Sequence, residues 1–456
     1  MSLKPYAEYK DSGQQWLGEI PAEWRLSPVK HVARLLAGGT PESSNDQYWT
    51  EAGGTSWVAI GDMSGRDMVV STTRQVTAEG MATKTLPIAP PGTVLFAMYA
   101  SVGEVSILGI HAAWNQALLG FRVNGDRADS KFLFYALKSV HGWLPVFYRS
   151  NTQNNLNAEQ VGNLVLPMPE KAEQQAIASY LERETAKIDA FIADQEELIK
   201  LLEERRTATI TQAVTKGLDP KALMKDSGVE WVGDVPAHWP ISKIGHQYEV
   251  VLGKMLDGAK DTPSGARMLP YVRAGNIQDA GLDLSDVNEM AYTAYEAERL
   301  NLLAKDLLVV EGGSVGTVHY LSEAMDGWSF QKTVNRVRSL GSADTQYLGH
   351  LIRVFRDSGV FEVICNGSTI MHLTAEKLRA LMIPVPPVEE QYSIAAFIDR
   401  ETAEIDATLA EAREAIALSK ERRAAVISAA VTGKIDVRGT NASATKNMEA
   451  ESVGVA

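Results

Sequence analysis

Two long stretches of the chain place apolar or small residues at steps of mostly four and three, with charged residues between them. They extend from about Glu170 to Thr215 and from Pro387 to Asp436, and no proline interrupts either run after its first residue. A narrow apolar stripe of this period predicts two long helices that pair along a seam, whereas two independent surface helices would leave the stripe without a partner. The predicted seam positions are Ile177, Leu181, Thr185, Ile188, Ile192, Gln195, Ile199, Leu202 and Ala213, then Ile394, Ile398, Thr402, Ile405, Leu409, Ala412, Ile416, Ser419, Val426 and Ala430.

The two helical stretches are copies of each other. PMPEKAEQQAIASYLERETAKID (Pro167–Asp189) aligns without gaps with PVPPVEEQYSIAAFIDRETAEID (Pro384–Asp406), 217 positions later. A second repeat lies upstream, where KDSGQQWLGEIPAEW (Lys10–Trp24) matches KDSGVEWVGDVPAHW (Lys225–Trp239). Repeats at a fixed spacing indicate one structural plan used twice. We therefore predict an antiparallel helix pair with a pseudo-twofold axis and a globular domain at each end.

The segments between the repeats are short β-like runs separated by glycine loops, so the predicted fold class is α+β. The expected boundaries follow the repeats. They are an N-terminal repeat segment on the helical frame (1–24), a first globular domain (25–168), a first long helix (169–218), a repeat loop (219–239), a second globular domain (240–386), a second long helix (387–436) and a disordered tail (437–456).

The charge distribution bears on the class of partner. A net charge of −13 argues at first against nucleic acid, but each helical stretch alone carries −4. The first globular segment has 11 basic and 10 acidic residues, and the second has 14 and 17, so each retains room for a basic face. One cysteine, Cys365, and no apolar N-terminal leader favour a reducing, cytoplasmic location.

Catalytic and metal-binding motifs are missing from the sequence. The segment EGGSVGTVH (Glu311–His319) lacks the lysine of a phosphate-binding loop, and no H-E-x-x-H or C-x-x-C occurs. The carboxylates of the helices lie among Lys and Arg, which is typical of a solvated helix face. The sequence therefore predicts a non-enzyme that holds no metal and no cofactor of its own.

In this order and repeated twice, the motifs resemble the DNA-specificity subunit of type I restriction–modification systems. The resemblance covers nearly the whole chain and rests on KDSGVEWVGDVPAHW, GGTPESSNDQYW, PYVRAGNI, LLVVEGGSVG, PVPPVEEQYSIAAFIDRETAEID and ERRAAVISAAVTGKIDVRG. It implies that both globular domains are target-recognition domains, each reading half of a bipartite, asymmetric site in double-stranded DNA. It also implies two modification (methyltransferase) subunits and restriction subunits as partners, with S-adenosylmethionine on the former and ATP and magnesium on the latter.

Polar loop residues supply the chemistry that reads base edges and holds phosphates, and with the resemblance they predict the DNA contacts. In the first domain these are Thr40, Trp57, Tyr99, Ser101, Asn115, Gln116, Asn151, Gln153, Asn154 and Asn155. In the second they are Tyr271, Arg273, Asn276, Ser314, Lys332, Asn335, Ser368, Thr369 and His372.

The repeated positions of the frame are the candidates for contacts with partner subunits. These are Trp16, Trp24, Arg205, Arg206, Trp231, Trp239, Arg422 and Arg423. Two alternatives stay open at this point: a protein–protein scaffold that uses the two globular domains as adaptors, and the recognition subunit of a fused restriction–methylation enzyme. A steep salt dependence of DNA binding distinguishes a DNA reader from a scaffold.

Overall fold

The computed structural model describes residues 4–147, 155–255, 265–365 and 371–439. It divides into two compact units, one made of residues 1–195 and 414–456 and the other of residues 196–413. The two longest helices, α5 (Lys171–Lys216) and α11 (Val388–Val431), each contribute one part to the first unit and one part to the second. None of the helices in the described parts of the chain is long and apolar enough to cross a lipid bilayer.

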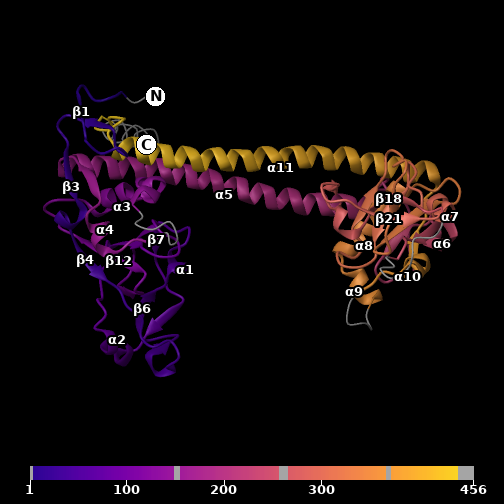
Figure 1. Ribbon diagram of the computed structural model, residues 1–456, viewed down its shortest axis with the longest axis horizontal. Helices are drawn as coiled ribbons and strands as arrows, with labels where there is room; N and C mark the ends of the chain where they lie inside the picture. The colour runs from indigo at the N-terminus through magenta and orange to yellow at the C-terminus, as the bar shows by residue number, and fades with distance from the viewer. Residues whose placement is uncertain (1–3, 148–154, 256–264, 366–370, 440–456) are drawn as a thin grey trace, which may run out of the picture. The chain divides into compact units, whose positions relative to one another are not determined.

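The first unit holds two larger sheets, in the strand orders β4-β12-β9-β10-β7 and β11-β6-β8-β5, and the two-stranded sheets β1-β2 and β13-β3. Figure 1 shows α3 and α4 next to α5 and places α2 at the far end of this unit. The strands are β1 (Tyr9–Asp11), β2 (Glu19–Pro21), β3 (Arg25–Pro28), β4 (Ala33–Ala37), β5 (Trp49–Thr50), β6 (Thr55–Val58), β7 (Met68–Val69), β8 (Arg74–Val76), β9 (Val94–Ala97), β10 (Val105–Leu108), β11 (Ala112–Trp114), β12 (Leu118–Val123) and β13 (Val165–Met168). The short helices are α1 (Ile60–Met63), α2 (Ala78–Lys84), α3 (Ser130–Ser139) and α4 (Ala158–Gly162).

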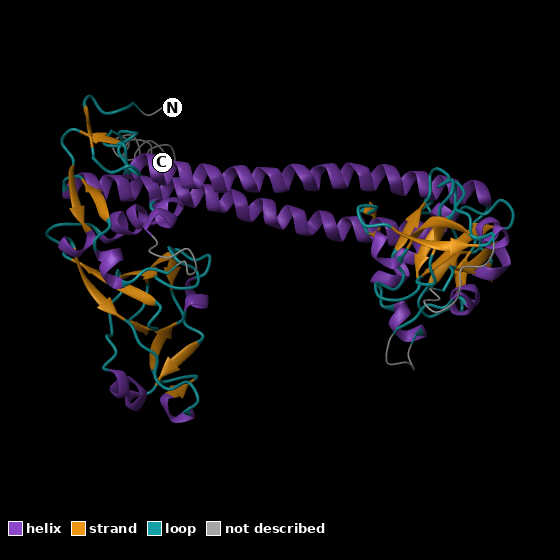
Figure 2. Cartoon of the chain, viewed as in Figure 1, coloured by secondary structure: helices purple, strands orange, loops and turns teal. Residues whose placement is uncertain are grey.

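The second unit repeats this plan with different residues. Its main sheet has the order β17-β25-β22-β23, and a second sheet has the order β21-β18-β24 (Figure 2). The strands are β14 (Met224–Asp226), β15 (Asp234–Pro236), β16 (Ile241–Lys243), β17 (Tyr248–Leu252), β18 (Arg267–Val272), β19 (Ile277–Gln278), β20 (Gly281–Leu282), β21 (Asn288–Tyr292), β22 (Leu307–Val310), β23 (Val318–Tyr320), β24 (Ser329–Phe330), β25 (Val334–Ser339) and β26 (Met382–Pro384). The short helices are α6 (Ile244–Gln247), α7 (Ala294–Arg299), α8 (Thr345–Asp357), α9 (Val360–Ile364) and α10 (Ala375–Ala380).

Strand pairing shows that the two units share one fold. The antiparallel pairs β12·β4, β12·β9 and β10·β9 of the first unit correspond to β25·β17, β25·β22 and β23·β22 of the second. The parallel pair β11·β6 corresponds to β18·β24. The predicted fold, two mixed α and β domains on a repeated frame of long helices, is therefore confirmed.

A repeated glutamine fastens each domain to its long helix. In the first unit the side-chain oxygen of Gln174 accepts the backbone N–H of Asp129, which caps α3, at 2.9 Å. In the second unit Gln391 accepts the N–H of Asp344, which caps α8, at 2.8 Å. Each amide nitrogen also donates to a proline carbonyl just before the long helix, so these buried glutamines have partners on both sides.

The predicted seam is buried within each unit. In the first unit Ile177 and Leu181 of α5 share a core with Ala430 of α11. In the second unit Ile394 and Ile398 of α11 share a core with Ala213 of α5. These contacts pair the start of one helix with the end of the other, so the helices pack antiparallel in both units. The remaining seam positions are buried or half-buried, and the buried positions that lie outside the predicted set include Ile210 and Ile427.

Candidate nucleic-acid interface

The structure brings together four loops of the first unit that carry predicted DNA contacts. The backbone N–H of Gly39 donates to the Trp114 carbonyl at 2.9 Å, which places Thr40 beside Gln116. The N–H of Met98 donates to the Ala117 carbonyl at 2.8 Å, and the N–H of Leu156 donates to the Met98 carbonyl at 3.0 Å. The loops around residues 38–40, 98–101, 115–117 and 155–156 thus form one surface, which we call the four-loop patch.

The second unit builds the same patch from largely different residues. The N–H of Lys254 donates to the Phe330 carbonyl at 3.0 Å, and the N–H of Glu311 donates to the Thr333 carbonyl at 2.8 Å. The N–H of Leu373 in turn donates to the Glu311 carbonyl at 2.8 Å. These bonds match those of the first unit one for one, and they join the loops around residues 253–254, 311–314, 331–333 and 372–373.

Two glycines allow the loops of each patch to approach so closely. A Cβ atom on Gly38 would lie 2.1 Å from the Asn115 carbonyl oxygen. A Cβ atom on Gly253 would lie 2.3 Å from the Gln331 carbonyl oxygen. No side chain fits at either place without moving backbone, so a glycine after the first strand of each main sheet is required by the close approach of the next loop.

The predicted residues fall into exposed and buried groups. Tyr99, Gln116, Ser314, Lys332 and His372 are exposed, and Thr40, Ser101, Asn115, Asn155 and Arg273 are half-buried at the surface of the patches or beside them. Asn151, Gln153, Asn154, Ser368 and Thr369 lie outside the described residues. The remaining four, Trp57, Tyr271, Asn276 and Asn335, are buried.

The buried members support the loops instead of presenting a side chain to solvent. Asn335 donates its side-chain N–H to the Leu373 carbonyl at 2.9 Å and thereby holds the fourth loop. Asn276 accepts the Arg273 N–H at 3.0 Å and donates to two carbonyls in the segment 283–286. Trp57 donates its indole N–H to the Gly39 carbonyl at 3.0 Å. Because the side-chain N–H groups of these residues already have partners inside the fold, the exposed neighbours are left as the candidates for contact with DNA.

The comparison with known families gives the identity of this arrangement. The sequence model described as the type I restriction modification DNA specificity domain matches the chain twice, over residues 21–201 and 236–415. Each match covers one domain and most of the long helix that follows it. The chain belongs to the type I restriction–modification DNA specificity family. It is therefore a DNA specificity subunit and not a catalytic subunit of such a system.

Individual relatives agree with this assignment along nearly the whole length. The MjaIX specificity subunit of Methanocaldococcus jannaschii is 24% identical over 401 residues, covering 83% of this chain and 86% of the relative. The EcoKI specificity subunit of Escherichia coli is 21% identical, covering 92% and 90%.

Solved structures share the fold. The HsdS subunit from Thermoanaerobacter tengcongensis superposes with a TM-score of 0.55 at 17% identity, covering 91% of this chain and 98% of that chain. A chain from a structural study of complex assembly and conformational transition of the type I R-M system gives a TM-score of 0.68 at 16% identity, covering 90% and 98%.

The tryptophan loops of this specificity subunit close the ends of the long helices. Trp24 and Trp239 are 1% and 0% exposed. A Cβ atom on Gly433, just after α11, would lie 3.2 Å from the Trp24 ring, and one on Gly217, just after α5, would lie 3.1 Å from the Trp239 ring. Their burial leaves no surface for a partner, so both tryptophans are assigned to the frame, while Trp16 is half-buried and Trp231 is exposed.

The first and the last described segments of the chain meet on the first unit. The backbone N–H of Asp436 donates to the Lys4 carbonyl at 2.9 Å, and the Tyr9 hydroxyl donates to the Gly433 carbonyl at 3.0 Å. The Tyr6 hydroxyl donates to Glu173 at 2.7 Å, and burial together with this carboxylate raises the pKa of Tyr6. The N-terminal repeat segment is thereby fixed on the end of α11. Residues 440–456 of the predicted disordered tail lie outside the described residues.

The four predicted arginines of the frame divide into two pairs of equivalent positions. Arg206 forms an ion pair with Asp406 at 3.1 Å, and Arg423 forms one with Asp189 at 2.8 Å. These two pairs are related by the 217-residue repeat, and each joins α5 to α11. Arg205 and Arg422 are exposed, so they are the members available for contact with a partner.

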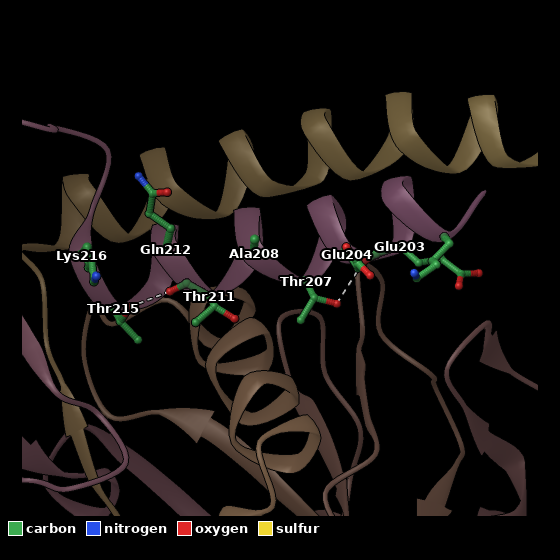
Figure 3. A pocket seen from close by; sticks show the side chains of 9 residues that line it. Glu203, Glu204, Thr207, Ala208, Thr211, Gln212, Thr215 and Lys216 are labelled. Atoms are coloured by element: carbon green, nitrogen blue, oxygen red, sulfur yellow. Dashed lines mark hydrogen bonds between the residues drawn. The ribbon is translucent and has the colours of Figure 1, made fainter. Parts of the chain in front are cut away.

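A groove of about 710 Å³ follows α5 in the second unit and is lined by residues from Lys200 to Lys216. Figure 3 shows Thr207, Thr211 and Thr215 along one side of α5 and Gln212 on the other side. The hydroxyls of Thr207 and Thr215 donate to the carbonyls of Glu203 and Thr211, four residues earlier, so neither protrudes as a free donor. The lining of the groove therefore offers few free donors, which does not favour a small-molecule site.

Proposed function

We propose that each four-loop patch reads one half of a bipartite, asymmetric site in double-stranded DNA. The observation that carries the proposal is the repetition of one loop arrangement with largely different surface residues. The backbone bonds at Gly39, Met98 and Leu156 recur at Lys254, Glu311 and Leu373. Ser101 recurs as Ser314, whereas Gly312 and Lys332 stand where the first unit has Tyr99 and Gln116. A shared scaffold with different polar side chains suits two different base sequences, because side chains at base edges carry the specificity.

The repeated frame supports a proposal about the partners. Two modification subunits are identical to each other, so they need two equivalent docking surfaces, and the repeated helices, with exposed Arg205 and Arg422, provide them. Restriction subunits join through the modification subunits. S-adenosylmethionine is then bound by the modification subunits, and ATP and magnesium by the restriction subunits. Within the described residues no group of His, Cys, Asp and Glu side chains is arranged to hold a metal ion.

Methylation mapping tests this proposal. Cells that express the specificity subunit with its modification subunit should gain methylated adenines at one bipartite, non-palindromic sequence. In vitro, the assembled complex should bind that duplex with an affinity that falls steeply as salt rises, with a log–log slope of several units. Binding that shows no preference for the mapped sequence over an unrelated duplex would contradict the assignment of the patches as readers.

Arg273 is the sharpest single-residue test of the second patch. Its loop contacts the patch through the Ala274 N–H, which donates to Thr333 Oγ1 at 3.0 Å, and its guanidinium forms an ion pair with Asp286. If the guanidinium reads a base, Arg273→Ala should weaken binding to the mapped site by roughly 1–3 kcal/mol and relax the preference at one base pair. Fluorescence anisotropy with singly substituted duplexes measures both effects.

The matched control removes an exposed arginine elsewhere in the same unit. Arg299, at the end of α7, lies outside the patch, and its side chain has no ion pair within the described residues. Arg299→Ala should leave the base preference unchanged. Should Arg273→Ala behave like this control, Arg273 would be removed from the readers while the other patch residues remained candidates.

A further inference from the structure

Arg353 of α8, in the second unit, is half-buried, and its side chain forms no hydrogen bond or ion pair within the described residues. It lines a cavity of about 220 Å³ together with Arg206 of α5 and Arg356 of α8. A guanidinium carries five N–H donors and stays charged, so removing it from water without an acceptor is unfavourable. The site therefore favours an anion that can supply the missing acceptors.

The first unit shows how the matching position is satisfied there. Lys138 lies nine residues after the capping Asp129 of α3, as Arg353 lies nine residues after the capping Asp344 of α8. Lys138 forms an ion pair with Asp67, and Asp67 also pairs with Arg423. This closed network of charges joins the recognition domain to the long helix without any ligand.

The second unit keeps the ion pair between the two long helices. Among its described residues, however, no carboxylate takes the place that Asp67 has in the first unit. Arg206, the counterpart of Arg423, pairs with Asp406 at 3.1 Å. The carboxylate of Asp279, which follows β19, pairs with Arg356 at 2.6 Å, and Arg356 also pairs with Asp357 at 2.8 Å. The two carboxylates that line the cavity, those of Asp279 and Asp357, therefore both form ion pairs with Arg356. No acidic side chain in the described parts of this unit bridges Arg353 to Arg206.

The surroundings of Arg353 fit an incoming negative charge. Burial lowers the pKa of Arg353, and the nearby Arg206 lowers it further, while Asp279 acts in the opposite direction. The guanidinium groups of Arg353 and Arg206 therefore repel each other. An oxyanion bound between them would offset this unfavourable electrostatic energy. At about 220 Å³ the cavity is below the roughly 300–1,000 Å³ of pockets that enclose drug-sized ligands, and it suits a single phosphate group.

We propose that Arg353 and Arg206 bind a phosphate of the target DNA backbone. The phosphate takes the place that Asp67 holds in the first unit and joins the second recognition domain to α5. The inference rests on the proposed function, which brings a polyanion to this domain. Asp279, which lines the cavity, lies three residues after Asn276, so the cavity adjoins the segment predicted to approach DNA.

Salt-dependent binding of the complex with its modification subunits tests the site. Arg353→Ala should weaken binding to the mapped duplex and to an unrelated duplex by a similar factor of about 3–30, because a phosphate contact carries no sequence information. The log–log salt slope should become shallower by about one unit. Arg353→Lys should restore part of both, since it keeps the charge but not the planar fork.

Controls separate this inference from the proposed function. Arg400→Ala removes an exposed arginine of α11 that already pairs with Glu401, and it should change neither affinity nor slope. Arg353→Gln, which keeps a long polar side chain, should repeat the effect of Arg353→Ala and serves if the alanine variant does not fold. A wild-type complex that fails to bind DNA would contradict the proposed function. A wild-type complex that binds DNA, with Arg353→Ala and Arg353→Gln unchanged in affinity and slope, would overturn the phosphate site alone.

Two further outcomes decide the source of the phosphate. If inorganic phosphate raises the melting temperature of the DNA-free wild-type chain but not of Arg353→Ala, while DNA binding is the same in both, the ligand is a free anion and the DNA contact is refuted. If Arg353→Ala alters the preferred bases and leaves the salt slope unchanged, Arg353 reads a base and the backbone contact is likewise refuted.

Discussion

Ile405→Asp should destabilise the helix frame and abolish the complex with two modification subunits. Ile405 lies on α11 in the predicted seam and is 4% exposed. An aspartate there would place a carboxylate in a buried seam position, so the free energy of unfolding should fall by roughly 3 kcal/mol or more. Urea denaturation of the free chain measures the loss, and size-exclusion chromatography with the modification subunit measures the assembly.

Ala407→Asp is the matched control for this change. Ala407 is two positions further along the same helix and is exposed, so the same carboxylate stays in water there. It should cost only about 0.5 kcal/mol through helix propensity and leave the complex intact. If Ile405→Asp unfolds at the same urea concentration as this control and assembles normally, pairing of α5 with α11 is not what supports the complex.

The helical frame could be predicted because it is the part of the chain that repeats. The same charged helical pattern occurs twice, and both copies carry an apolar stripe of the same period. This is enough to predict which residues form the seam and that the two helices pair along it. Ile210 and Ile427 lie three positions before Ala213 and Ala430, so the same period reaches them, but the predicted seam does not include them. Each packs into the core of the unit in which its long helix ends, where the core is wider than a two-helix seam.

For the sheets and patches, the sequence predicts only that short strands alternate with polar loops, and not how the strands pair or which loops meet. The strands are short, and the loops that form a patch are separated by tens of residues, so periodicity gives no information on their pairing. Residue type predicted which loops are polar, but not which polar groups are already satisfied inside the fold. The sequence makes Asn335 and Arg273 equally plausible as DNA contacts. In the structure Asn335 is buried under a loop, whereas Arg273 reaches the surface.

Arg353 could not be found from the sequence for a related reason. It is one of many arginines on a helical pattern, and its lack of a partner among the described residues depends on Asp279 pairing with Arg356 instead. A signal does exist in the chain, because the repeated glutamines Gln174 and Gln391 align the capping residues of α3 and α8. That alignment matches Lys138 with Arg353, but residue types do not reveal which of the two forms an ion pair.

A fragment ending at Lys221 should form a symmetric homodimer with two copies of the first recognition domain. In the first unit α11 contributes Ile427, Ala430 and Val431 to the core around Ile177 and Leu181. The residues 217 positions earlier, on α5, are Ile210, Ala213 and Val214, which are the same three side chains. A second copy of the fragment therefore supplies the same three core side chains that the intact chain uses.

The ion pair of the frame is preserved in the same way. Arg423 pairs with Asp189 in the intact chain, and Arg206 is its counterpart in the fragment. The contacts made by Val437 and Arg438 are not reproduced, because their counterparts in the fragment are Pro220 and Lys221. Because they lie outside the seam, their loss should weaken the dimer without preventing it.

With modification subunits present, this homodimer should methylate a palindromic site made of the first half-sequence, a spacer and its inverted repeat. A protein with a twofold axis selects DNA with the same symmetry, so the second half-sequence should no longer be required. Sedimentation of the fragment and methylation mapping in cells that express it test the two steps. Ile210→Asp in the fragment is the control, since it places a charge in the shared core and should leave the fragment monomeric and inactive. A monomeric wild-type fragment, or methylation that remains at the original asymmetric sequence, would show that the two copies of the frame are not equivalent in function.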